Sequence, residues 1–121
     1  MEDGSYTVRG TVRDKTNEKK VKPIRTMLGD LFDQVELVNA DLLNAESLMN
    51  AAEGCEYIVH TASPFPLVEP KDENELIKPA VDGTMAVMEA ARKHKVKRVV
   101  ITSSVASIFD SENMKEKFDE Q

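Results

Sequence analysis

The chain has 121 residues, of which 40% are hydrophobic and 31% charged, and this balance is typical of a folded globular domain. Its 16 basic and 22 acidic side chains give a net charge of −6, which argues against a general nucleic-acid binder. The single cysteine excludes a disulfide framework, and the charge-free runs 57–68 and 99–109 are too short to span a bilayer. We therefore expect one cytoplasmic domain, residues 1–121, with no metal site and no membrane or nucleic-acid partner. Its oligomeric state is left open.

Four short runs rich in β-branched and apolar residues predict strands, over residues 6–12, 35–39, 57–61 and 98–102. The run 57–61 is apolar enough to be buried on both faces. Between the runs, helical patterns extend from Thr16 or Asn17 to about Leu28, over 45–52, and from about Asn74 to His94. The acidic tail from Asp110 is expected to be loop with a weak helix.

Capping residues and prolines set the expected limits of these helices. Asn44 is placed to cap the second helix, and Gly54 to end it. Pro23 predicts that the first helix is short or broken, and Pro79 marks a new first turn or a kink in the third. In the third helix, one line of residues at helical spacing predicts the buried face: Ala80, Thr84, Val87 and Ala91.

Strands and helices alternate along the chain, which predicts an α/β fold with a parallel sheet, right-handed crossovers and helices on both faces. In such sheets, ligands bind at the carboxyl ends of the strands. The segments to inspect are therefore those that follow the predicted strands: 13–14, 39–41, 61–63 and 102–104.

Basic residues follow the first strand, with Arg13 at its end and Lys19, Lys20 and Lys22 shortly after it. An Arg and a Lys at this point of a dinucleotide-binding fold suit the 2′-phosphate of NADP. Surface charge at a strand-to-helix turn explains the same residues, and spacing alone favours that explanation.

The other strand ends also allow two interpretations. A carboxylate at Asp41 can accept the amino group of an adenine or can cap a turn. The small residues of 61–63 admit a cofactor close to the backbone or form an ordinary polar turn. Ser104 can hydrogen-bond a substrate carbonyl or cap a helix. We interpret His60 as a core histidine, His94 as a partner of a helix dipole, and Cys55 as a small core residue.

Several segments, in order, resemble the extended short-chain dehydrogenases/reductases of the NAD-dependent epimerase/dehydratase superfamily. The resemblance is closest to dihydroflavonol reductases, cinnamoyl-CoA reductases and fungal methylglyoxal/aldehyde reductases. The matching segments are Tyr6–Asp14 with 16–20 behind it, His60–Phe65, Glu73–Thr84 and Val99–Ser104. The resemblance covers nearly the whole chain, and its several motifs make it far more specific than any one of them alone.

The resemblance implies an NADP-binding Rossmann fold and an oxidoreductase that reduces a small aldehyde or ketone. It assigns Arg13 and Lys20 to the 2′-phosphate, Asp41 and Leu42 to the adenine, and Ser104 to the carbonyl as the catalytic serine. The cofactor channel would be lined by Thr61, Ala62 and Ser63. A sugar epimerase, a hydroxysteroid dehydrogenase and a non-enzymatic partial domain that binds a partner or a nucleotide are the alternatives.

Two family features are missing from these residues: the Gly-rich turn with the strand before it, and the Tyr-x-x-x-Lys pair after the serine turn. The chain therefore resembles a truncated or fragmentary form, running from the second strand of the family fold to just past its fifth. In the order 3-2-1-4-5-6, the first strand lies between the second and the fourth. We therefore expect the strands at 6–12 and 57–61 each to have an unpaired edge, and the chain alone to be inactive.

Overall fold

The computed structural model describes residues 6–64 and 72–105, and the expectations for Phe65 and for the tail from Asp110 lie outside these ranges. The described chain alternates between strands and helices, which confirms the predicted α/β pattern. The elements in order are β1 (Val8–Val12), α1 (Glu18–Leu28), the 3₁₀ helix η1 (Gly29–Gln34), β2 (Val35–Asn39), α2 (Ala45–Ala51), β3 (Tyr57–His60), α3 (Asn74–Lys93) and β4 (Arg98–Ile101).

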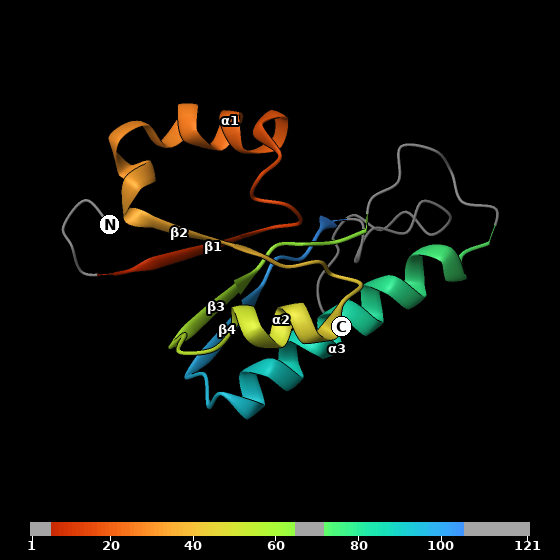
Figure 1. The fold of residues 1–121 in the computed structure, drawn as a ribbon. Helices are drawn as coiled ribbons and strands as arrows, with labels where there is room; N and C mark the ends of the chain where they lie inside the picture. Colours follow the sequence, from red (N-terminus) through yellow and green to blue (C-terminus); the bar gives the residue numbers. More distant parts are fainter. Residues whose placement is uncertain (1–5, 65–71, 106–121) are drawn as a thin grey trace, which may run out of the picture.

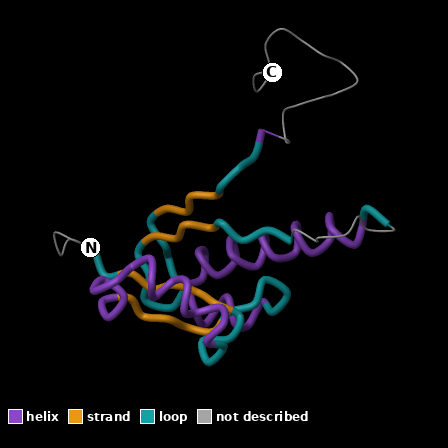
Figure 2. The backbone as a smooth tube through the Cα atoms, turned by 90° about the horizontal axis from the view of Figure 1, so that it is seen from above, coloured by secondary structure: helices purple, strands orange, loops and turns teal. Residues whose placement is uncertain are grey.

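The strands form two separate parallel pairs (Figure 2). β1 pairs with β2 from Val8 opposite Val35 to Val12 opposite Asn39. β3 pairs with β4 from Tyr57 opposite Arg98 to His60 opposite Ile101. Within the described residues no ladder joins β1 to β3, so the expected unpaired edges at these two strands are confirmed. Helix α1 lies on one side of the strands, and α2 and α3 lie on the other (Figure 1).

The helix ends follow their capping residues in part. The Asn44 side chain accepts a hydrogen bond from the Ser47 N–H, so the predicted N-cap of α2 is confirmed. Gly54 follows α2 with a φ of +75°, a conformation that favours glycine. Asn17 precedes α1 but makes no side-chain capping bond. The 3₁₀ helix that begins at Gly29 has no counterpart in the predicted pattern.

Neither proline ends its helix, so the expected break at Pro23 and the expected new first turn at Pro79 do not occur. Pro23 lies inside the 11 residues of α1, and Pro79 lies inside the 20 residues of α3. Each proline removes one backbone donor, and the remaining turns hold the helix. No helix in the described ranges is long and apolar enough to cross a membrane.

The buried apolar residues lie on α3, which packs against α2, β3 and β4, and at Val21 of α1, with Ala40 after β2 and Ala52 after α2. Of the predicted buried face of α3, Val87 and Ala91 are buried, whereas Ala80 and Thr84 are only partly buried. His60 of β3 is only 7% exposed. His60 lies within 3.5 Å of the Thr84 hydroxyl, and burial lowers the pKa of its imidazole. The interpretation of His60 as a core histidine is therefore confirmed.

The other face of β3 is open, so the expectation that both faces are buried is wrong. Val59 is 68% exposed and Tyr57 52%, and Val100 on the neighbouring strand is also exposed. The apolar pattern is typical of a strand that is covered on both faces. In this structure α3 packs on one face, and the side chains of the other face are exposed.

Candidate functional site

The carboxyl ends of all four strands lie on the same side of the molecule (Figure 1). At the end of β1, the turn 13–17 is held by hydrogen bonds from two sides. The Asn39 Oδ1 atom accepts the Lys15 backbone N–H at 2.9 Å. The Asp14 Oδ1 atom accepts the Thr16 hydroxyl at 2.6 Å and the Thr16 N–H at 2.8 Å. These bonds from Thr16 lower the pKa of the Asp14 carboxyl.

The two cations predicted to bind a phosphate project from this turn and from the helix after it. Arg13 and Lys20 are both exposed, and neither side chain forms a hydrogen bond or an ion pair with any residue of 6–64 or 72–105. In contrast, Arg25 pairs with Glu18 on the same helix. The arrangement leaves Arg13 and Lys20 available for an anion at the carboxyl end of β1.

Asp41 and Leu42 form the turn between β2 and α2. The Asp41 Oδ1 atom accepts the Leu43 N–H at 2.9 Å, and the Asp41 N–H donates to the Ser47 hydroxyl at 2.9 Å. Asp41 therefore caps its own turn, which was one of the two interpretations of this residue. The same turn lies beside the Arg13 turn, because the Ala40 N–H donates to the Val12 carbonyl.

Gly83, a buried residue of α3, positions Leu42 and was not singled out from the sequence. A Cβ atom on Gly83 would overlap the Leu42 side chain and lie 3.1 Å from the Leu42 carbonyl oxygen. The helix therefore packs directly on the β2–α2 turn at this glycine. A glycine in the middle of a helical pattern was the available signal. Beside this contact, a cavity of about 340 Å³ lies between the turn and the first half of α3.

We expect Gly83→Ala to destabilise the complete protein, even though alanine is the better helix former by about 1 kcal/mol. The new methyl group would overlap Leu42, and overpacking of this kind costs about 1–3 kcal/mol. Thermal unfolding should therefore show a lower Tm. Leu42→Ala removes most of the overlap, so in that background Gly83→Ala should cost clearly less. An equal loss in both backgrounds would contradict the steric explanation.

The second group of predicted site residues lies at the ends of β3 and β4. Thr61, Ala62 and Ser63 are exposed and follow β3, and Ser104 is exposed and follows β4. The backbone N–H of Thr102 donates to the His60 carbonyl at 3.1 Å, which holds the two strand ends together. The bond places the two strand ends beside each other, and the small residues and the serine turn each continue from one of them.

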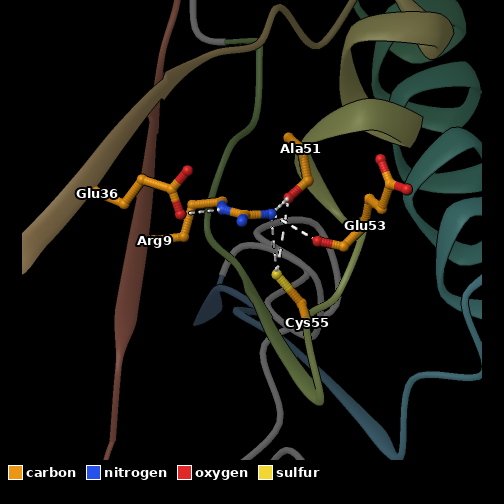
Figure 3. Close-up of polar contacts among 5 residues, drawn as sticks. All are labelled: Arg9, Glu36, Ala51, Glu53 and Cys55. Atoms are coloured by element: carbon orange, nitrogen blue, oxygen red, sulfur yellow. Dashed lines mark hydrogen bonds and ion pairs between the residues drawn. The ribbon is translucent and has the colours of Figure 1, made fainter.

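Arg9 of β1 connects the first strand pair to the segment that leads into β3 (Figure 3). Its Nε atom donates to Glu36 at 2.7 Å, and its Nη1 atom donates to the carbonyls of Ala51 at 3.0 Å and Glu53 at 2.6 Å. Cys55 lies at the same place, with its sulfur 3.8 Å from Arg9 Nη1. Its thiol donates to the Ala51 carbonyl, and the side chain is only partly buried. Arg9 is thus a structural cation, unlike Arg13.

Comparison with known proteins identifies similar sequences over nearly the whole chain. Residues 8–121 match the 3-beta hydroxysteroid dehydrogenase/isomerase family. The chain is 42% identical over 106 residues to anthocyanidin reductase of Arabidopsis thaliana, covering 85% of this chain and 30% of that protein. It is 39% identical over 116 residues to the bifunctional dihydroflavonol 4-reductase/flavanone 4-reductase of Malus domestica, covering 95% and 33%.

The fold is also similar to that of a solved structure. Vestitone reductase from alfalfa (Medicago sativa L.) aligns with a TM-score of 0.61 and 33% identity, covering 88% of this chain and 31% of that structure. The chain therefore spans about a third of the length of the relatives that it matches. This agrees with the expected partial Rossmann fold.

Proposed function

Because the chain belongs to the extended short-chain dehydrogenases/reductases, in the branch of the dihydroflavonol, cinnamoyl-CoA and anthocyanidin reductases, we propose that the complete protein is an NADP(H)-dependent carbonyl reductase. The relatives that match at 36–42% identity are named as reductases, which supports the reaction class. The observation that carries the choice of cofactor is the fixed turn 13–17, from which Arg13 extends without a protein partner in the described residues.

The residues at the strand ends fit this cofactor. Arg13 and Lys20 would hold the 2′-phosphate, because a guanidinium and an ammonium both suit a dianion. Asp41 and Leu42 would flank the adenine, with one Asp41 oxygen already used by the turn. The channel toward the reacting carbon would be lined by small residues: Thr61, Ala62 and Ser63. When bound, NADPH supplies the hydride.

Ser104 would hydrogen-bond the substrate carbonyl oxygen and stabilise the negative charge that develops on it. The serine is exposed at the carboxyl end of β4, beside the end of β3, which supports this role. The tyrosines of the chain, Tyr6 and Tyr57, both precede it. We infer that the proton donor comes from a part of the complete protein outside these 121 residues.

A second function is favoured by the name of the matching family, which is that of 3-beta hydroxysteroid dehydrogenase/isomerase. The two functions are separated by substrate. The proposed reductase consumes NADPH with aldehydes or with flavonoid-type ketones, whereas a hydroxysteroid dehydrogenase reduces a nicotinamide cofactor with a 3β-hydroxysteroid. Absorbance of the reduced nicotinamide, followed with both substrate panels, distinguishes them. Turnover of the steroid alone would contradict the proposal.

We expect the complete protein to prefer NADPH to NADH, and Arg13→Asp to remove that preference. Each lost charge-assisted contact costs about 1.5–3 kcal/mol, which corresponds to a roughly 10- to 150-fold loss in kcat/KM for NADPH. Kinetics with both cofactors would measure the ratio. Arg25→Asp makes the same charge change at a side chain that already pairs with Glu18, and it should leave the ratio unchanged. Equal kinetics of the wild-type protein with the two cofactors would contradict the assignment.

A further inference from the structure

Asn39 is the last residue of β2 and lies directly opposite Val12, the last residue of β1. Its side chain reaches past the strand end and accepts the backbone N–H of Lys15 at 2.9 Å. An N–H can only donate, so the atom that faces Lys15 must be the amide oxygen. The bond ties the turn after β1 to the neighbouring strand, 24 residues away along the chain.

The backbone on both sides of Arg13 is therefore fixed. Before it, the Val12 carbonyl accepts the Ala40 N–H at 2.9 Å. After it, Asn39 holds Lys15, and Asp14 binds Thr16. The Arg13 side chain itself makes no bond within the described residues. The turn thus fixes the point from which Arg13 leaves the backbone, which reduces the conformational freedom lost when an anion binds.

The chemistry of Asn39 is suited to a neighbouring anion. A carboxylate at this position would accept the same hydrogen bond, but it would add a negative charge close to the ligand. An amide supplies the acceptor without that charge. We propose that Asn39 is a positioning residue for cofactor selectivity, which holds the Arg13 turn in the geometry that binds a 2′-phosphate. This inference rests on the proposed function.

Two substitutions in the complete protein separate geometry from charge. Asn39→Leu removes the acceptor at similar size, whereas Asn39→Asp keeps the acceptor and adds a charge. Asn50→Leu, on the exposed surface of α2, is the matched control. The probes are adenosine 2′,5′-bisphosphate and adenosine 5′-monophosphate, with calorimetric dissociation constants measured at low and high salt. The ratio of the two dissociation constants reports the contribution of the 2′-phosphate to binding.

We expect Asn39→Leu to weaken the bisphosphate by roughly 3- to 10-fold relative to wild type at both salt concentrations. The dissociation constant of the monophosphate should change by less than about twofold, because this probe lacks the 2′-phosphate. Asn39→Asp should also weaken binding of the bisphosphate. Its loss of affinity relative to wild type should be smaller at high salt, because salt screens an exposed charge. Asn50→Leu should match wild type. In turnover, Asn39→Leu should raise the KM for NADPH and leave kcat unchanged.

Three outcomes would overturn the inference. If Asn39→Leu binds the bisphosphate like wild type, the turn does not depend on Asn39, although the Arg13 assignment stands. If Asn39→Leu weakens both probes equally, its role is merely structural. If the wild-type protein itself does not prefer the bisphosphate, the proposed 2′-phosphate site fails, and the inference fails with it.

Discussion

Replacing Ser104 by alanine in the complete protein is expected to lower kcat roughly a hundredfold or more and to leave NADPH binding nearly intact. The serine follows the carboxyl end of β4, whereas the residues proposed to hold the phosphate and the adenine follow β1 and β2. Its hydroxyl would act on the charge that develops on the carbonyl oxygen, so its loss raises the barrier to reaction without changing cofactor affinity.

Ser103→Ala is the matched control, because it removes the same hydroxyl from the adjacent exposed position. Steady-state kinetics give kcat for both variants, and fluorescence titration gives the dissociation constant for NADPH. Ser103→Ala should have a much smaller effect on kcat. If the two variants showed the same small loss, the assignment of Ser104 would be wrong.

The local sequence pattern determines most of the elements. The strand Val35–Asn39 was predicted to the residue, and Asn44 predicted the start of α2 through its side-chain cap. Proline was a poorer guide, because Pro23 and Pro79 lie inside continuous helices. A single missing N–H does not end a helix whose other turns are intact.

The strand ends that form the candidate site were predicted in position, but the contacts around them were not. The ends of the strands could be found from the pattern, so the ligand-binding edge followed from topology. The contacts that shape it join residues far apart in the chain, such as Gly83 with Leu42 and Asn39 with Lys15. Composition and spacing carry no information on such pairs. The exposure of Val59 was also not predictable, because burial depends on which elements cover a face.

A polypeptide limited to residues 1–121 is expected to be insoluble or molten and to show no NADPH-dependent turnover of aldehydes. β1 and β3 each have an edge without a partner among the described strands, and unpaired edges of apolar strands template aggregation. Val59 and Val100 add an exposed apolar face beside the β3 edge. No ladder joins the two strand pairs in the described residues, and β1 is instead linked to the segment before β3 by the hydrogen bonds of Arg9. These bonds stabilise the arrangement weakly, because each side-chain hydrogen bond contributes only about 1 kcal/mol.

The contribution of the exposed apolar face to insolubility can be tested separately. Val59→Lys with Val100→Lys places charge on that face and should raise the soluble yield of the 121-residue polypeptide. Met27→Lys adds a charge at an exposed position of α1 and should not change the yield. Circular dichroism and thermal melts then report whether the soluble material unfolds cooperatively. A soluble wild-type monomer of these 121 residues that unfolds cooperatively and binds NADPH at micromolar concentration would refute the prediction. It would mean that packing of α2 and α3, with the Arg9 contacts, is sufficient to hold the two strand pairs without a strand between them.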